Sequence, residues 1–245
     1  MPEVTFNVYR GDSAGGDGVD YKIEVEPGMV VLDAMFRIQQ TQAPDLAIRW
    51  NCKAAKCGSC SAEINGKPRL MCKTRLDSID TTQTVTVRPM KTFPLIKDLV
   101  TDVSWNYEVN KKIPPFTPAP NTVWKMQQED INRPQEFRKC IECFMCQNVC
   151  HVLREHDKKA VFGGPRFFIR AASLDMHPLD TLSRTKLLKD TLGLGYCNIT
   201  KCCTEVCPED IHITDNGIIP MKERIVDDFY DPITRMLRVF SGKSK

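Results

Sequence analysis

Cysteine is the residue type in this chain whose number and spacing indicate chemistry. The sequence has 12 cysteines among 245 residues, and eleven of them fall into three closely spaced sets. The N-terminal stretch lacks the basic start and apolar segment of a secretory signal, so we expect an intracellular chain. Dense cysteine in a reducing compartment points to metal or redox chemistry rather than to disulfides. We therefore interpret the three sets as metal-binding loops.

The first set has the spacing of a [2Fe–2S] loop. It comprises Cys52, Cys57, Cys60 and Cys72, in the pattern C-x4-C-x2-C with a fourth cysteine beyond a predicted hairpin turn. Plant-type ferredoxins use this spacing. Gly58 lets backbone N–H groups approach the sulfurs, and such hydrogen bonds raise the reduction potential. A structural zinc site is the alternative, although zinc loops more often use two short cysteine pairs.

The other two sets are versions of the run C-x2-C-x2-C-x3-C, which is typical of bacterial ferredoxins. The first version comprises Cys140, Cys143, Cys146 and Cys150. The second comprises Cys197, Cys203 and Cys207, with Thr200 in the place of the second cysteine. In two-cluster proteins the fourth cysteine of each run binds the cluster of the other run.

That crossover predicts which cysteines share a cluster. The predicted [4Fe–4S] ligands are Cys140, Cys143, Cys146 and Cys207. The predicted [3Fe–4S] ligands are Cys150, Cys197 and Cys203. The third site has one ligand fewer because the neutral hydroxyl of Thr200 is a poor iron ligand.

One cysteine and the four histidines have no ligand role in this scheme. Cys202 is interpreted as a thiol outside the clusters, pointing in a different direction from Cys203; if it turned inward, the third cluster could be a second cubane. His151 adjoins Cys150, and a structural role is favoured over one near a quinone or cluster. Surface or core positions are predicted for His156, His177 and His212.

The elements around the cysteines predict two domains. Residues 1–105 read as a plant-type ferredoxin domain of β-grasp type, with a glycine-rich turn at 11–18 and a helix over 31–40. A second hairpin turns at Asn65-Gly66, and a further strand covers 85–87.

Residues 106–245 read as a mostly α-helical, bacterial-type two-cluster ferredoxin domain, entered through the proline-rich stretch 110–120. Helices are expected over the ranges 127–140, 166–175, 181–193 and 221–230. The fold class is therefore α+β.

Composition and charge argue against several function classes. With 34 Lys and Arg against 31 Asp and Glu, the net charge of +3 gives no reason to propose a nucleic acid partner. No apolar run reaches the roughly 18 residues that cross a bilayer, so membrane association is expected to come through partners. We find no catalytic acid, base or nucleophile constellation, which assigns chemistry on carbon to another chain.

With these sets in place, the chain resembles the iron–sulfur subunit of succinate dehydrogenase and fumarate reductase. The resemblance covers nearly the whole chain and includes the segments CKAAKCGSCSAEINGKPRLMC, RPMKTFPLIKDLVTD, CIECFMCQNVC and CNITKCCTEVCP. It implies a flavoprotein partner with covalently held FAD, membrane-anchor subunits that often carry haem b, and a quinone. It also implies an electron path from [2Fe–2S] near the flavin through [4Fe–4S] to [3Fe–4S], at the cytoplasmic face of the membrane.

Three positions depart from the pattern of ubiquinone-reducing members. His151, Glu155 and Asn198 stand where those members have proline, tryptophan and histidine. The resemblance is therefore closer to members that use menaquinone and a haem-bearing anchor. We do not assign the quinone pocket of the ubiquinone-reducing members to this chain. The apolar tail, with Met236, Leu237, Val239 and Phe240 beside Arg235 and Arg238, is expected to pack as an ordinary helix or to face the anchor.

Other readings stay open at this point. The reaction could run as quinol:fumarate reduction, because driving force depends on the quinone and on cluster potentials. A subunit of another flavin dehydrogenase would lack the plant-type domain, and a thiol-linked fumarate reductase usually carries further cysteine repeats. A zinc-stabilised interaction module is the alternative from another class, and iron and acid-labile sulfide would separate it from an iron–sulfur protein.

Overall fold

The computed structural model describes residues 2–233, which fall into two compact units. The first unit comprises Met1–Trp105 and Ile141–Val149, and the second comprises Asn106–Cys140 and Cys150–Lys245. The chain thus changes unit at residue 105, and the segment with Cys143 and Cys146 belongs to the first unit. The apolar tail considered above lies outside the described residues.

A mostly antiparallel sheet forms the first unit. Its strands are β1 (Glu3–Asp12), β2 (Gly15–Glu24), β3 (Ser61–Ile64), β4 (Lys67–Leu70), β5 (Val85–Arg88), β6 (Leu95–Lys97) and β7 (Val100–Thr101). Their order is β4-β3-β5-β1-β6-β7, with β2 paired to β1, and the β1–β5 pair is parallel. The short strands β6 and β7 were not predicted from the sequence.

The long β1–β2 hairpin differs from its prediction at the turn. The glycine-rich segment was expected to be turn throughout, but the strands pair as far as Asp12 and Gly15. Glycine is needed there because the two strands approach closely: a Cβ on Gly16 would lie 2.2 Å from the Arg10 carbonyl oxygen. Alternating side chains such as Phe6 and Val8 are fully buried, as the period of two predicted.

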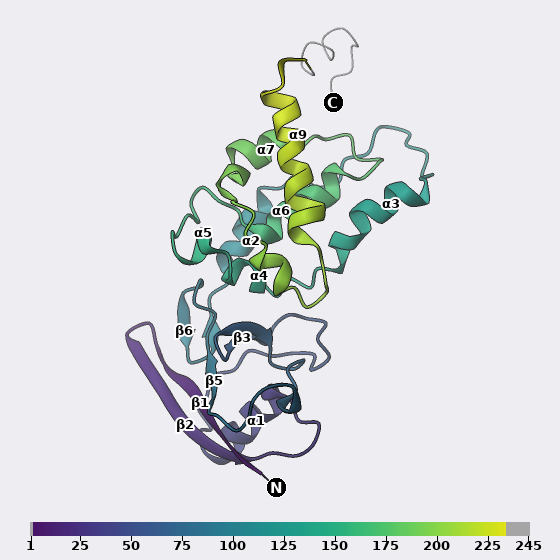
Figure 1. Cartoon of the computed structure of the whole chain (residues 1–245). Helices are drawn as coiled ribbons and strands as arrows, with labels where there is room; N and C mark the ends of the chain where they lie inside the picture. The colour runs from purple at the N-terminus through teal and green to yellow at the C-terminus, as the bar shows by residue number, and fades with distance from the viewer. Residues whose placement is uncertain (1, 234–245) are drawn as a thin grey trace. The chain divides into compact units, whose positions relative to one another are not determined.

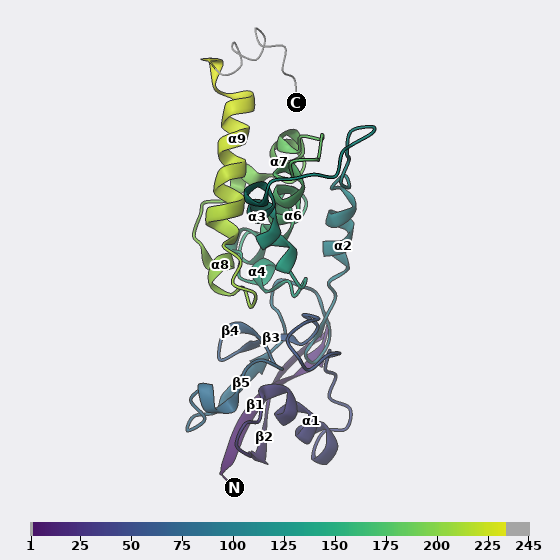
Figure 2. The same ribbon diagram turned by 90° about the vertical axis from the view of Figure 1, so that its right-hand side faces the viewer.

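Helix α1 (Val31–Thr41) confirms the predicted helix and lies beside the β1–β2 hairpin (Figures 1 and 2). Its buried face carries Leu32, Met35 and Ile38, each at most 1% exposed. Asp33 caps the helix by accepting a hydrogen bond from the Val30 N–H at 3.1 Å. The unit also contains η1 (Leu76–Ser78) and α4 (Met145–Asn148).

The second unit is built of short helices, the first of which begins two residues before the unit does. They are α2 (Ser104–Lys111), α3 (Gln128–Gln135), η2 (Glu136–Lys139), α5 (His151–Arg154), α6 (Pro165–Asp175), α7 (Thr185–Asp190), η3 (Leu194–Tyr196), α8 (Cys202–Glu205), η4 (Ile213–Ile218) and α9 (Ile219–Phe229). Helix α6 is the core of the unit and packs on α3 and on η4, a π-helical segment that continues into α9 (Figure 1). Its Phe167, Phe168 and Ile169 are at most 2% exposed.

Two predicted helices are shorter than expected for identifiable reasons. The helix predicted over 127–140 divides after Gln135 into α3 and η2, one residue beyond Pro134, which cannot donate a backbone hydrogen bond. The helix predicted over 181–193 is limited to α7, because the residues before it form a loop around buried Arg184. The Arg184 guanidinium donates to the Pro115 carbonyl at 2.8 Å and to Asp180 at 2.9 Å, which fastens the proline-rich stretch.

No helix within residues 2–233 combines the length and apolar character that a membrane span requires.

Candidate metal centres

The first cysteine set is assembled by the loop after α1 together with the β3–β4 hairpin. Cys60 precedes β3 and Cys72 follows β4, so the pairing of these strands sets them side by side, and the Cys72 N–H donates to Cys60 Sγ at 3.4 Å. Cys52 and Cys57 are joined by a side-chain hydrogen bond, and Cys57 interacts electrostatically with Cys60. The structure therefore brings all four predicted [2Fe–2S] ligands together.

Backbone N–H groups converge on the sulfur of Cys52. Ala54 and Lys56 each donate to its Sγ at 3.4 Å, and these bonds lower the pKa of the Cys52 thiol to about 6. The unusual left-handed backbone of Lys53 (φ 53°) and Ala55 (φ 55°) shapes this loop. Burial has the opposite effect on Cys60, whose pKa rises to about 12. Thiol sulfurs with converging N–H donors fit an iron–sulfur cluster, which thiolates ligate and hydrogen bonds tune.

The two cysteine runs have the same backbone, although one ligand differs. In both the first run (residues 140–150) and the second run (residues 197–207), the first cysteine ends a 3-10 turn in extended conformation. The residues on each side of the second ligand position are left-handed, and a four-residue helix begins directly afterwards. These left-handed residues are Glu142 (φ 55°) and Phe144 (φ 59°) in the first run and Ile199 (φ 62°) and Lys201 (φ 61°) in the second.

The recurrence of this conformation is informative because it is costly. A non-glycine residue in the left-handed region costs about 1–2 kcal/mol. Four such residues at matching places identify one loop conformation that the chain uses twice. Thr200 occupies the place that Cys143 occupies in the first run.

The fourth cysteine of the first run lies with the cysteines of the second. Cys150 interacts electrostatically with Cys203, and Cys203 interacts with Cys197. Cys150 and Cys197 are thus each within electrostatic range of Cys203. Burial raises the pKa of Cys150 to about 12 and that of Cys203 to about 11, so bare thiols would be protonated there. Their binding of iron stays a prediction.

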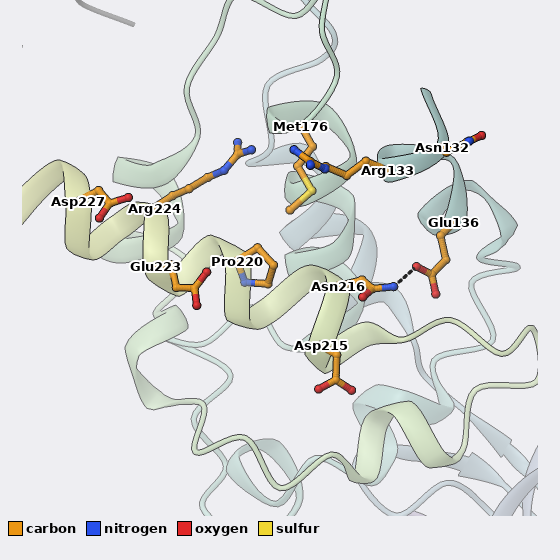
Figure 3. A pocket seen from close by; sticks show the side chains of 10 residues that line it. All are labelled: Asn132, Arg133, Glu136, Met176, Asp215, Asn216, Pro220, Glu223, Arg224 and Asp227. Atoms are coloured by element: carbon orange, nitrogen blue, oxygen red, sulfur yellow. Dashed lines mark hydrogen bonds between the residues drawn. The ribbon is translucent and has the colours of Figure 1, made fainter. Parts of the chain in front are cut away.

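The segment before Cys140 packs against the segment that follows Cys207. Glu136 Oε1 accepts a hydrogen bond from the His212 backbone N–H at 2.7 Å, and its Oε2 accepts one from Asn216 Nδ2 at 2.5 Å (Figure 3). Burial raises the pKa of Glu136, but the bonds from Asn216 and His212 outweigh it and hold the pKa below its ordinary value. The approach of these flanks favours the predicted crossover; the shared ligation of one cluster by Cys140, Cys143, Cys146 and Cys207 stays a prediction.

Within the first unit, the loop around Cys143 lies directly on the first cysteine loop. Gly58 is left-handed at φ 67°, and a Cβ placed on it would lie 2.7 Å from the Cys143 Cα. Ser61 Oγ is 3.0 Å from both the Gly58 and the Cys143 carbonyl oxygens. The single hydroxyl proton is shared between two acceptors, which belong to the loops of two predicted clusters.

A buried polar network fastens the end of α4 to the same unit. Asn148 Nδ2 donates to Glu63 Oε1 at 2.8 Å, and Asn148 Oδ1 accepts from the Thr92 N–H at 3.1 Å. The Thr92 hydroxyl donates to the Asn148 carbonyl at 3.0 Å. All three residues are at most 7% exposed. These three residues were not predicted from the sequence, because their spacing along the chain carries no signal.

Three of the histidines make ring contacts. His151 lies edge-to-face with His156, with ring centroids 6.3 Å apart, and His177 packs in the same manner on Phe116 at 4.8 Å. Burial lowers the pKa of His177. Within residues 2–233 no group of three or more His, Cys, Asp or Glu side chains is gathered for a single metal ion. A cluster differs from such an ion because its thiolates are distributed over several irons.

A polar pocket of about 560 Å³ lies in the second unit between α3, η4 and α9 (Figure 3). Its lining residues are Asn132, Arg133, Glu136, Met176, Asp215, Asn216, Pro220, Glu223, Arg224 and Asp227. Cysteine is absent from this lining, so we do not count the pocket as part of the predicted redox sites.

Comparison with known proteins agrees with this geometry. Residues 5–108 match the domain family described as a 2Fe-2S iron-sulfur cluster binding domain, and residues 136–211 match a 4Fe-4S dicluster domain. The chain is 62% identical to a chain in the solved structure of the Mycobacterium smegmatis Sdh1 complex in the apo form, with a TM-score of 0.92. That alignment covers 94% of this chain and 98% of the other.

Curated relatives include iron–sulfur subunits of succinate dehydrogenase and of fumarate reductase. The succinate dehydrogenase iron-sulfur subunit of Bacillus subtilis is 28% identical, covering 86% of this chain and 88% of the relative. The fumarate reductase iron-sulfur subunit of Escherichia coli O157:H7 is 31% identical, covering 78% and 79%. The chain spans only 42% of the length of an uncharacterized iron-sulfur protein of Methanococcus maripaludis, to which it is 29% identical.

A 2Fe-2S domain followed by a dicluster domain defines the class of two-domain iron–sulfur proteins that transfer electrons. Within that class, this chain belongs to the family of iron–sulfur subunits of succinate dehydrogenase and fumarate reductase. The α+β fold class and the family resemblance expected from the sequence are both confirmed.

Proposed function

We propose that this chain is the electron-transfer subunit of a succinate:quinone oxidoreductase. It lies between a flavoprotein subunit that holds FAD and membrane-anchor subunits at which quinone is reduced. When bound, iron–sulfur clusters supply one-electron redox chemistry, which a flavin can match by giving up its electrons singly. The observation that carries the proposal is the position of Cys150, a residue of the first run, within electrostatic range of Cys203 of the second.

Each cysteine set then has a stated role. The [2Fe–2S] ligands are Cys52, Cys57, Cys60 and Cys72. The [4Fe–4S] ligands are Cys140, Cys143, Cys146 and Cys207. The [3Fe–4S] ligands are Cys150, Cys197 and Cys203. The polypeptide buries about half of these cysteines and directs N–H groups at the sulfurs of Cys52 and Cys60, which tunes the reduction potential of the first site.

The partners are inferred from family membership and from His151, Glu155 and Asn198, which depart from the pattern of ubiquinone-reducing members. We infer an anchor that carries haem b, menaquinone as the favoured quinone, and a peripheral position on the cytoplasmic face of the membrane. The opposite direction, quinol:fumarate reduction, is the second candidate, because a fumarate reductase subunit is 31% identical to this chain.

The test begins with the intact complex, purified with its partner subunits. We expect iron and acid-labile sulfide, with less non-haem iron than sulfide because a three-iron core lacks one corner, and an oxidised-state EPR signal of a three-iron cluster. Zinc without inorganic sulfide would overturn the proposal.

The variant Cys150→Ser tests the crossover. We expect it to abolish the three-iron signal and to leave the [4Fe–4S] cluster in place, because Cys150 binds the cluster of the second run. Loss of the [4Fe–4S] cluster with retention of the three-iron signal would instead mean that each run binds its own cluster. Thr204→Ser, on α8 beside the same site, is the control and should keep both signals.

A further inference from the structure

Cys202 lies beside the position at which the third site lacks a ligand. Thr200 stands where the first run has its second cysteine, and its Oγ1 is 3.4 Å from Cys202 Sγ. A thiol sulfur is therefore in contact with the side chain that replaces the fourth ligand. From the sequence, Cys202 was predicted to lie outside the clusters, because its side chain follows a different direction from that of Cys203.

Cys202 also shares the surroundings of the predicted [3Fe–4S] ligands. It interacts electrostatically with both Cys150 and Cys203, and Cys203 in turn interacts with Cys197. Cys150, Cys197 and Cys202 are thus each within electrostatic range of Cys203, and together the four offer the number of thiolates that a cubane cluster requires. Because Cys202 is only half-buried, an iron ion can reach it from solvent.

We propose that Cys202 is the fourth ligand of an iron-capture site, which lets the third site hold a [4Fe–4S] cluster when ferrous iron is supplied under reducing conditions. This inference rests on the proposed function, because it requires a three-iron cluster at Cys150, Cys197 and Cys203.

The binding of Fe²⁺ at this site requires no oxidant or reductant. The one-electron-reduced core, [3Fe–4S]⁰, combines with Fe²⁺ and the Cys202 thiol to give [4Fe–4S]²⁺. One iron–thiolate bond forms, the S–H bond breaks, and the proton goes to solvent. No electron is gained or lost in this step, and the electron that reduces the core beforehand comes from the chain's own redox partner or from dithionite.

The change needed in the protein is small. The side chain of Cys202 has one rotatable bond that moves its sulfur, so rotation about Cα–Cβ redirects it without moving the backbone. Thr200 does not compete for the iron, because a neutral hydroxyl is a much weaker ligand than a thiolate.

The experiment uses the intact complex in two forms, wild type and Cys202→Ser. Each is reduced with dithionite without oxygen, incubated with ferrous ammonium sulfate, freed of unbound iron and briefly reoxidised. EPR then records the three-iron signal, and Mössbauer spectroscopy with isotopically enriched iron shows where the added iron resides. The [2Fe–2S] signal of the reduced sample reports whether each variant is folded, and Cys202→Ala is the second variant if serine is not tolerated.

We expect wild type to lose its three-iron signal and to gain labelled [4Fe–4S], while Cys202→Ser retains the signal. Equal retention in both forms would overturn the iron-capture site and leave the proposed function intact. Equal loss in both forms would also overturn it, because the iron would then be held without Cys202. Absence of any three-iron signal and of sulfide before treatment would mean that the proposed function itself fails.

Discussion

The two cysteine runs share a backbone but differ in what surrounds them. Both place their ligands on a left-handed loop that is followed by one helical turn, α4 or α8. In the first run every ligand position is a cysteine, whereas the second has Thr200. The loop conformation therefore does not depend on the complete ligand set, and we expect one side chain to decide how many irons each site holds.

The supports of the two loops also differ. Around Cys143 they are polar groups of the first unit, with Ser61 on the carbonyl of Cys143 and Asn148 held by Glu63 and Thr92. Around Cys203 the support is a pair of threonines: Thr204 Oγ1 donates to Thr214 Oγ1 at 3.1 Å, and Thr214 Oγ1 lies 3.5 Å from Cys203 Sγ. The first run is therefore held through a backbone carbonyl and the Asn148 side chain, and the second has a hydroxyl directed at the sulfur of a predicted ligand.

The largest expected effect comes from making the ligand sets equal. In Thr200→Cys the second run has the complete ligand set of the first, so we expect the third site to hold [4Fe–4S] and the oxidised-state three-iron EPR signal to be lost completely. Thr200→Ser is the matched control, because it keeps a hydroxyl at that position and should keep the signal. If Thr200→Cys retained a full three-iron signal, position 200 would not be the missing ligand.

A smaller effect is expected from Gly58→Ala, which crowds the first run only. The left-handed backbone of Gly58 costs alanine about 1–2 kcal/mol, and overpacking against Cys143 adds about 1–3 kcal/mol. We expect the complex to melt at a lower temperature and to lose [2Fe–2S] and [4Fe–4S] content before the three-iron signal.

Gly66→Ala separates the two causes. Gly66 is also left-handed, at φ 73°, but a Cβ there would meet no atom within 4 Å. It should show the backbone cost without cluster loss. Equal behaviour of the two alanine variants would mean that the contact between Gly58 and Cys143 is unimportant.

Asn148→Ala removes the side-chain support of the first run. Hydrogen bonds to charged groups contribute about 1.5–3 kcal/mol, and the Glu63 carboxylate would lose one of its donors. We expect destabilisation of that order, measured by denaturant unfolding. The matched position in the second run is Glu205, which is exposed, so Glu205→Ala should change stability by less than about 0.5 kcal/mol. Similar losses of stability in both variants would mean that Asn148 supports the first run no more than Glu205 supports the second.

The sequence predicted the ligand loops and missed what holds them, for a physical reason. Ligands on one loop have fixed spacing, so Cys140, Cys143 and Cys146 can be recognised in a single sequence. Supports such as Ser61 and Thr214 come from distant segments, and a lone serine or threonine looks the same whether it binds a sulfur or water. The length of α7 was overestimated for a related reason, because buried Arg184 imposes a loop that local periodicity does not show.

The smallest effect concerns the hydroxyl beside Cys203. Because Thr214 Oγ1 accepts the hydrogen bond from Thr204, its own proton is directed at the Cys203 sulfur, where it favours negative charge. Thr214→Val keeps the shape of the side chain and removes the donor, so the reduced third site is less stabilised and its reduction potential should fall. A neutral hydrogen bond contributes about 1 kcal/mol, which limits the fall to roughly 40 mV for one electron. Potentiometric titration of the three-iron EPR signal measures this fall in potential.

Thr181→Val, which removes an exposed hydroxyl bonded to the Thr117 carbonyl, should leave the potential unchanged. An unchanged or higher potential in Thr214→Val would show that the Thr214 proton points elsewhere.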